Sequence, residues 1–264
     1  GLKYISDGQL WHPIEENSLE KEYRKMAERH GSLSINSENI FPIIKKWLYS
    51  DHDIFYRELI SNGCDAITKL RKLDMMGEYT LADGFKGQIK VIVNPQDKTL
   101  KFIDNGLGMT AEEVEEYINQ IAFSGATDFI EKYKDKTNED QIIGHFGLGF
   151  YSAFMVSDKV EIDTLSYIDG SEAVHWESTS GMDFEMNQSD SQERGTYITM
   201  HLSDDSIEYL ESDKLKGTLL KYFSFLPVNL YFIDVQEEEK KAAEIQKKSE
   251  EAKEKGELTK ETFD

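Results

Sequence analysis

Two alternating apolar runs constrain the fold more than any other feature of the sequence. The runs QIKVIVN (88–94) and TLKFID (99–104) flank an Asn-Pro-Gln-Asp turn. Because successive side chains in a strand point to opposite faces, such runs around a tight turn predict a β-hairpin. Further strand-like runs occur at 159–167, 173–178, 195–202 and 228–234. We therefore expect a sheet built mainly from antiparallel neighbours.

Helical spacing is grouped in blocks before and between these strands. The block DIFYRELISNGCDAITKLRKL (53–73) repeats apolar residues at helical intervals, and Thr110 is a suitable N-cap for another helix. Ser37 is a further N-cap, after a short alternating run, and 215–226 is also helix-like. Helices grouped apart from hairpin strands are typical of α+β proteins. The prediction is a two-layer α+β sandwich, with helices on one face of a mostly antiparallel sheet.

The two ends of the chain differ from its middle. Residues 1–30 are a charged lead-in with a helix-like stretch that stops at Gly31, and we interpret them as an extension. Residues 236–264 are nearly all Glu, Lys, Ala and Gln, so they have few apolar side chains to bury. This composition is typical of a charged linker, helical at best in part. The folded domain is then 31–235, and the chain looks like a piece of something longer.

Charge and cysteine content exclude several classes of function. A net charge of −21 argues against nucleic acid as the main partner, because phosphate backbones are bound by cationic surfaces. The single cysteine, Cys64, rules out an internal disulfide and fits a reducing compartment, where we expect it to be a small buried side chain. No apolar run is long enough for a membrane span, and no signal-peptide layout is present. A cytoplasmic protein is the simplest interpretation.

Three short motifs carry candidate chemistry. In RELISNGCDA, Glu58, Asn62 and Asp65 lie at i, i+4 and i+7, on one stripe beside the apolar face of the expected helix. Taken alone, this stripe is more often a solvated face. In FIDNGLGM, Asp104 ends a strand and two glycines follow, which let a ligand approach the main chain, although a turn alone is the commoner explanation.

The third motif is IIGHFGLGFYSAFMV (142–156). Its glycines Gly144, Gly147 and Gly149 fit neither the dinucleotide fingerprint nor the phosphate loop with its lysine. A glycine-rich turn entering a helix near Phe150 favours an anion, because the first N–H groups of a helix lack partners. By itself this signal is weak, since a sharp turn before a buried helix has the same pattern.

Together and in this order, the three motifs closely resemble the nucleotide site of the heat-shock protein 90 chaperone family. The later stretch RGTYITMHL (194–202) resembles the same family, whose N-terminal domain is matched along nearly all of 31–235. The lead-in is similar to a bacterial form. The resemblance implies a Bergerat-type ATP-binding fold that binds ATP or ADP with Mg²⁺. It also implies a clamp cycle, driven by hydrolysis, that remodels client proteins.

The resemblance also implies residue roles. Asn62 would ligate Mg²⁺, Glu58 would orient or deprotonate the attacking water, and Asp104 would accept from the adenine amine. Thr196 would assist Asp104 through water. The other implied nucleotide-site residues are Asp65, Ala66, Gly108, Met109, Gly144, Gly147, Gly149 and Phe150.

Residues 110–143 would form a lid over bound nucleotide. Here the sequence departs from many relatives, which have Lys, Thr and Asn where this chain has Phe123, Ala126 and Tyr117. These departures leave the hydrolysis rate open. His145 stands where the family often has Gln, and we interpret it as a packing residue rather than a catalytic one.

The family's middle domain supplies an arginine to the γ-phosphate, and its C-terminal domain holds a homodimer together. We expect neither in this chain, so the predicted behaviour is that of a monomer that binds ATP and ADP and hydrolyses slowly, with clients and co-chaperones as partners of the full-length protein. Residues 1–30 are either a strap to a partner's domain or a disordered leader. Two other hypotheses are a nucleotide-regulated binding module without efficient hydrolysis, and a gyrase-like or MutL-like ATPase, which the acidity disfavours.

Overall fold

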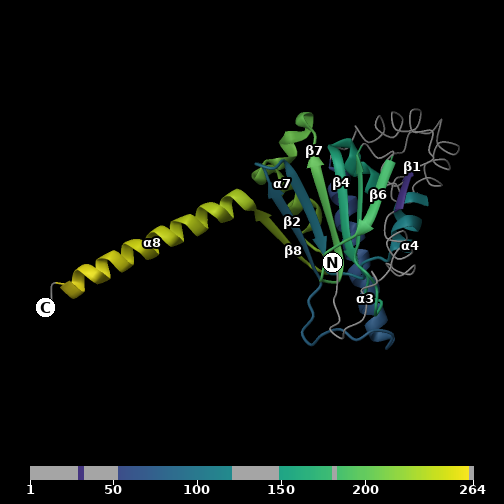
Figure 1. Ribbon diagram of the computed structural model, residues 1–264, viewed down its shortest axis with the longest axis horizontal. Helices are drawn as coiled ribbons and strands as arrows, with labels where there is room; N and C mark the ends of the chain where they lie inside the picture. The colour runs from purple at the N-terminus through teal and green to yellow at the C-terminus, as the bar shows by residue number, and fades with distance from the viewer. Residues whose placement is uncertain (1–28, 33–52, 121–148, 180–182, 262–264) are drawn as a thin grey trace, which may run out of the picture.

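The computed structural model describes residues 29–32, 53–120, 149–179 and 183–261 (Figure 1). The eight strands in these ranges form one sheet in the order β1-β6-β5-β4-β7-β3-β2-β8. All neighbours are antiparallel except β2 and β8, which run parallel. The strands are β1 (Arg29–Ser32), β2 (Gln88–Asn94), β3 (Thr99–Asp104), β4 (Ser157–Leu165), β5 (Val174–Thr179), β6 (Asp183–Gln188), β7 (Gly195–Leu202) and β8 (Asn229–Asp234).

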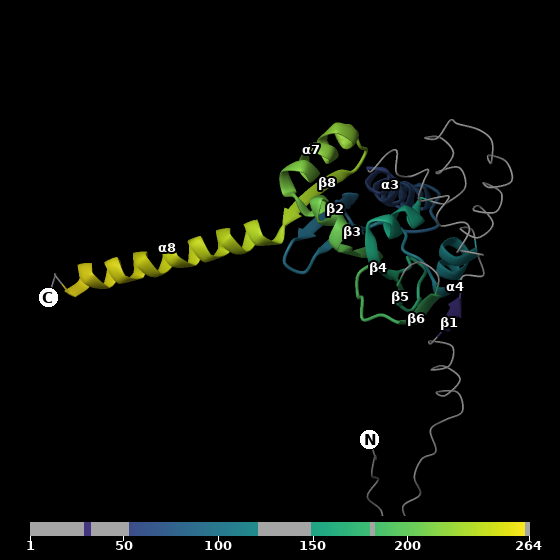
Figure 2. The same ribbon diagram turned by 90° about the horizontal axis from the view of Figure 1, so that it is seen from above.

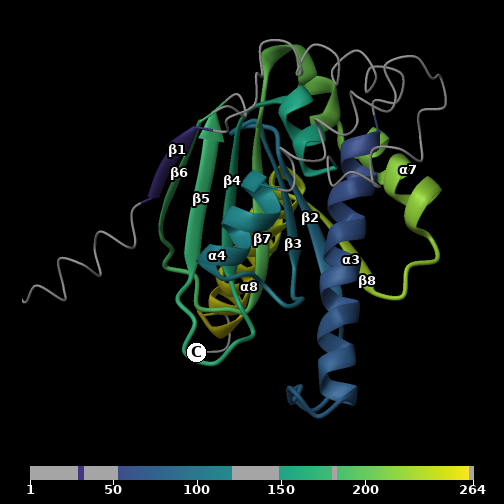
Figure 3. The same cartoon turned by 90° about the vertical axis from the view of Figure 1, so that its right-hand side faces the viewer.

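The helices cover one face of this sheet. Figures 2 and 3 show α3 and α7 on the same side of the strands, while α8 runs away from the domain. The helices are α3 (Ile54–Met75), α4 (Ala111–Val114) with the π-helical η1 (Glu115–Gln120), the 3₁₀ helices η2 (Phe150–Met155) and η3 (Asp204–Leu210), α7 (Ser212–Phe223) and α8 (Val235–Glu261). The predicted α+β sandwich, mostly antiparallel with helices on one face, is confirmed.

The core lies between the helices and the covered face of the sheet. Alternate residues of β2 and β4 are buried, and so are the residues of α3 that repeat at helical spacing. Trp176 of β5 is completely buried against Phe150 and Phe154 of η2, with edge-to-face ring contacts. Cys64 is buried as expected. The opposite face of the sheet is polar along β4, β5 and β6, and no helix of the described residues covers it.

The hairpin of β2 and β3 forms as the sequence predicts. Its strands pair in register from Ile89 opposite Asp104 to Asn94 opposite Thr99. The Asn94 side chain accepts from the backbone N–H groups of Gln96 and Asp97, so the turn is closed by a side chain that mimics backbone. This hairpin fixes where β3 ends, and with it the position of Asp104.

Several sequence expectations were wrong in detail. Arg29 and His30 lie in strand β1 rather than in a helix, because they pair with β6. The β6 strand itself was not expected: only Phe184 and Met186 on its covered face are apolar, so its alternation is weak. The helix after the glycine-rich motif is a short 3₁₀ turn. The charged C-terminal segment is helical through residue 261 rather than only in part.

Candidate functional site

A cavity of about 450 Å³ opens between α3, the end of β3, α4 with η1, and the start of η2. Ten of the predicted site residues line it. They are Glu58, Asn62, Asp65, Ala66, Asp104, Gly108, Met109, Gly149, Phe150 and Thr196. Gly144 and Gly147, as well as His145, Phe123 and Ala126, lie outside the described residues. Residues of all three motifs, from Glu58 to Phe150, therefore meet at one place.

The polar stripe of α3 forms one wall of this cavity. Glu58 is half-buried, whereas Asn62 and Asp65, one and two turns later, are exposed toward the opening. The apolar residues of α3 hold the helix against the sheet, so the stripe is placed at the edge of the core. Lys69, one turn after Asp65, extends the stripe and also lines the cavity. The sequence signal for Lys69 was the same helical spacing, and our prediction missed it.

Glu58 packs directly against the backbone of Gly149. A Cβ atom at Gly149 would lie 2.0 Å from Oε2 of Glu58, so no larger residue fits without moving the carboxylate. Partial burial raises the pKa of Glu58, and the neighbouring Arg57 acts in the opposite direction. A half-buried carboxylate with a raised pKa at a cavity wall is a suitable proton acceptor or water-positioning group.

Asp104 is the last residue of β3, and its side chain lies close to α3. Its Oδ1 accepts from the backbone N–H of Gly106 at 2.8 Å. Burial raises the pKa of Asp104 to about 7, although the Gly106 hydrogen bond and the charge of Arg194 act to lower it. The close approach of α3 requires small residues: a Cβ at Gly106 would lie 2.6 Å from the Cβ of Ala66. Asp104 is thus a buried acceptor that favours a ligand with a hydrogen-bond donor.

A small hydroxyl network adjoins Asp104. Thr196 of β7 is directly opposite Asp104 in the sheet, and its Oγ1 lies 3.0 Å from Oγ1 of Thr164. Thr164 in turn accepts from the backbone N–H of Met109 at 3.0 Å. This bond ties the loop after β3 to β4. Gly108 in that loop has φ +66°, and a Cβ there would lie 1.8 Å from the carbonyl oxygen of Leu165, so only glycine fits.

Arg194 holds the same loop from outside the cavity. Its Nη1 donates to the carbonyl oxygens of Asn105 and Gly106. The guanidinium also lies over the rings of Tyr79 and Phe85, 5.8 and 5.5 Å from their centroids. Three segments far apart in sequence are therefore fixed around the carboxylate of Asp104.

The remaining walls are apolar, apart from two side chains near the opening. Glu113 of α4 and the half-exposed Tyr117 of η1 both line the cavity. Glu113 also completes a capping box with Thr110: each side chain accepts from the other residue's backbone N–H. Our prediction used Thr110 as a cap but did not place Glu113 in the site. The apolar lining residues are Leu59, Leu107, Ile118, Ile162 and Ile198.

The arrangement suits a flat, polar heterocycle carrying a charged group. The apolar walls, the Asp104 carboxylate and the paired hydroxyls of Thr164 and Thr196 can bind the amine of a heterocycle. Glu58 and Asn62 of α3 lie toward the opening. Comparison with known proteins decides the family: residues 56–215 match the model described as histidine kinase-, DNA gyrase B-, and HSP90-like ATPase. The chain belongs to this ATPase family. The match spans the cavity residues from Glu58 to Thr196.

Curated relatives place the chain in the bacterial HSP90 branch of these ATPases. It is similar to the chaperone protein HtpG of Bacteroides fragilis, with 51% identity over 202 residues, which are 76% of this chain and 29% of that protein. It is 46% identical over 211 residues to HtpG of Porphyromonas gingivalis, covering 79% of this chain and 30% of that protein. HtpG of Oleidesulfovibrio alaskensis is 36% identical over 211 residues, covering 79% and 33%.

The chain thus spans about a third or less of the length of these HtpG proteins. Their similarity confirms the resemblance drawn from the three motifs. Among the residues that the structure describes, no helix has both the length and the apolar character needed to cross a bilayer.

Proposed function

We propose that this HSP90-like ATPase domain binds ATP or ADP in the cavity and hydrolyses ATP with Glu58 as the catalytic acid–base residue. The observation that carries the proposal is that residues of three separate motifs line one cavity of about 450 Å³. Asp104 would accept from the adenine amine, with Thr196 beside it. Ala66, Gly108 and Met109 would contact the base, while Gly149 and Phe150 would lie at the phosphate end together with Gly144 and Gly147.

The residues at the opening fit a magnesium ion. Asn62 offers an amide oxygen and Asp65 a carboxylate on the same exposed stripe, and Mg²⁺ prefers a few hard oxygen ligands alongside phosphate oxygens. We therefore assign Asn62 as the protein ligand. When bound, the ion would neutralise phosphate charge. Glu58, one helical turn from Asn62, would hold the attacking water and accept its proton, and Gly149 would keep the carboxylate in place.

The proposal extends to the full-length protein. There, hydrolysis would drive a clamp cycle in a cytoplasmic homodimeric chaperone that acts on client proteins with co-chaperones. The present chain would be a monomer with slow turnover, because it spans only about a third or less of its HtpG relatives. The predicted domain limits 31–235 move to 29–235, because Arg29 and His30 pair with β6, and the lid at 110–143 remains part of this proposal.

A second candidate is a nucleotide-regulated binding module with negligible hydrolysis. Tyr117 favours it, because this half-exposed residue lines the cavity where the family resemblance implies Asn in many relatives.

The two candidates are separated by Glu58→Ala in the full-length protein. If Glu58 is catalytic, the variant keeps ATP affinity within about threefold and loses turnover by at least tenfold, in the range expected for an acid–base residue. Turnover that is unchanged in Glu58→Ala supports the regulatory module instead. Lys72→Ala, an exposed residue of α3 outside the cavity lining, is the matched control for a change on the same helix.

A further inference from the structure

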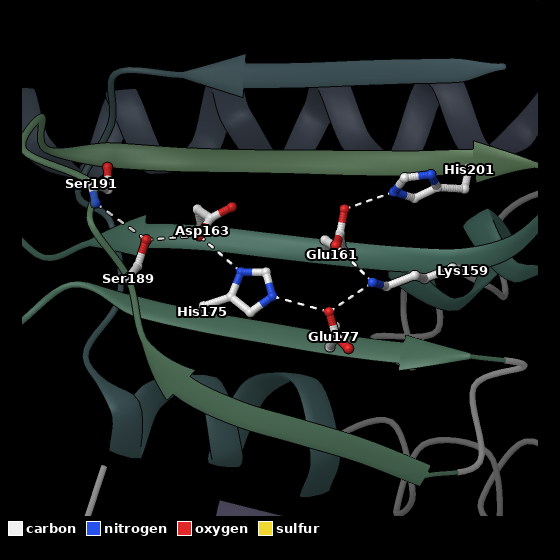
Figure 4. A network of polar contacts seen from close by, with 8 residues as sticks. All are labelled: Lys159, Glu161, Asp163, His175, Glu177, Ser189, Ser191 and His201. Carbon is white, nitrogen blue, oxygen red and sulfur yellow. Dashed lines mark hydrogen bonds and ion pairs between the residues drawn. The ribbon is translucent and has the colours of Figure 1, made fainter. Parts of the chain in front are cut away.

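The uncovered face of the sheet carries a cluster of charged side chains away from the cavity (Figure 4). Lys159, Glu161 and Asp163 alternate along β4 with buried residues, so they point away from the helices. On the neighbouring strands, register pairs Glu161 with Glu177, Asp163 with His175, and Lys159 with His201. Three adjacent strands therefore present these six side chains on one rigid surface.

Two carboxylates of this cluster face each other. Glu161 and Glu177 are directly opposite across β4 and β5, an arrangement that is unfavourable for like charges. Lys159 relieves it, since its Nζ lies 2.8 Å from Oε1 of Glu161 and 2.7 Å from Oε2 of Glu177. The position between the two carboxylates is thus one that a cation must fill.

His175 directs a ring nitrogen at the same position. Its Nδ1 lies 2.9 Å from Oδ1 of Asp163, and that oxygen also accepts from Ser189 at 2.7 Å. Because an ionised carboxylate only accepts, Nδ1 carries a proton and Nε2 is the nitrogen available to bind. Nε2 lies 3.2 Å from Oε2 of Glu177. In the neutral ring both atoms are acceptors, so only a proton or a metal cation can sit between them.

We propose that Glu161, His175 and Glu177 form a binding site for a divalent transition-metal ion of the Zn²⁺ class, which displaces the ammonium of Lys159. The three potential ligand atoms already lie within 4.8 Å of one another. A tetrahedral Zn²⁺ ion with bonds of roughly 2.1 Å needs ligands about 3.4 Å apart, which side-chain rotation on a fixed sheet can supply. One imidazole and two carboxylates favour Zn²⁺, Co²⁺ or Ni²⁺ over Mg²⁺ or Ca²⁺.

The surroundings of these three residues resemble the outer shell of a metal site. Metal-binding histidines commonly donate their second N–H to a carboxylate, as His175 does to Asp163. Asp163 is itself held by Ser189, whose hydroxyl accepts from the backbone N–H of Ser191 at 3.2 Å. On the other side, Nε2 of His201 lies 2.7 Å from Oε2 of Glu161 and orients that carboxylate.

A metal at this site competes with a proton. Partial burial acts to lower the pKa of His175, but its bonds to Asp163 and Glu177 outweigh this and raise the pKa above its ordinary value. The other charged groups near the ring are Glu161 and Lys159 of β4 and Glu185 of β6, which is opposite Glu177, with His201 beyond them on β7. Binding is therefore measured at pH 7.5, where competition from protons is weaker than at lower pH.

The experiment is a calorimetric titration of ZnCl₂ into the chelator-treated chain, without nucleotide, at pH 7.5. We expect one saturable site with micromolar affinity. His175→Gln and Glu177→Gln should each weaken binding at least tenfold, and His201→Gln less. Lys159→Met should strengthen binding several-fold, because it removes the competing ammonium. Asp158→Asn removes an exposed carboxylate from the same strand outside the cluster and should leave affinity unchanged.

Far-UV circular dichroism of each variant separates loss of the site from loss of the fold. The proposal is overturned if the wild type binds Zn²⁺ no more tightly than a folded His175→Gln, or if Lys159→Met weakens binding. It is also overturned if Asp158→Asn loses as much affinity as Glu177→Gln, since binding would then reflect surface charge alone.

Discussion

At the scale of single residues, Asp104 links the cavity to protein stability. Its folded pKa of about 7 is above the value of about 3.9 in an unfolded chain, because the carboxyl is buried. Between these pH values the folded state binds more protons than the unfolded state, so this group makes the free energy of unfolding fall as pH rises.

Asp104→Asn removes this contribution. Between pH 5 and 7.5 the wild type should lose about 2 to 3 kcal/mol more of its free energy of unfolding than the variant does. Urea unfolding of both proteins at the two pH values checks this. An equal loss in both would mean that Asp104 titrates in the folded state as it does in water.

Gly149 provides a second test at this scale. Gly149→Ala must displace the carboxylate of Glu58, which a Cβ would approach to 2.0 Å. In the full-length protein, turnover should fall at least tenfold, as for loss of a positioned acid–base group, while ADP affinity changes by a smaller factor. Gly217→Ala in α7 is the matched control, because a Cβ at Gly217 has open space around it. Turnover unaffected by Gly149→Ala would contradict the role of Glu58.

At the scale of elements, patterns with strong local signals were predictable. The β2–β3 hairpin, α3 and the Thr110 cap follow from alternation, helical spacing and a side-chain acceptor. The weakly apolar β6 was missed because its pairing with β5 and β1, rather than its own composition, makes it a strand. Each site motif alone was ambiguous, because strand pairing rather than local sequence brings the motifs together. The β3–β7 pairing that sets Thr196 opposite Asp104 joins residues far apart in sequence.

The long helix α8 was underestimated because its stabilisation is electrostatic rather than apolar. Glu237, Glu244 and Glu251 each have a lysine four residues later, a spacing that supports a helix, and Lys241 also lies 2.9 Å from Glu238. Figure 1 shows the helix projecting from the domain beyond its first turns.

Because these pairs are exposed, salt should weaken the helix. Changing Lys241, Lys248 and Lys255 to Glu should reduce the ellipticity at 222 nm in 10 mM salt. Changing the same three residues to Arg should preserve it. In 1 M salt the difference between the two variants should shrink. A difference that is independent of salt would show that charge pairing is not what holds α8.

At the scale of the whole molecule, the two faces of the sheet carry different sites. The covered face, with its helices, forms the cavity, and the uncovered face carries the proposed metal site. The chain spans about a third or less of its HtpG relatives, so the chaperone cycle proposed above is tested in the full-length protein.

Turnover by this chain alone should therefore be at least tenfold slower than that of the full-length protein under the same conditions, while ADP affinity is similar. A steady-state ATPase assay of both proteins measures the difference. Equal turnover would show that the domain needs no further residues to complete its site.

If the cavity binds adenine nucleotide through Asp104, a calorimetric titration of ADP with Mg²⁺ into the wild-type chain and into Asp104→Asn will show it. We expect one saturable site in the wild type and its loss in a variant that remains folded. Undiminished binding by Asp104→Asn would contradict the assignment of the adenine contact, and no binding by the folded wild type would contradict the nucleotide site as a whole.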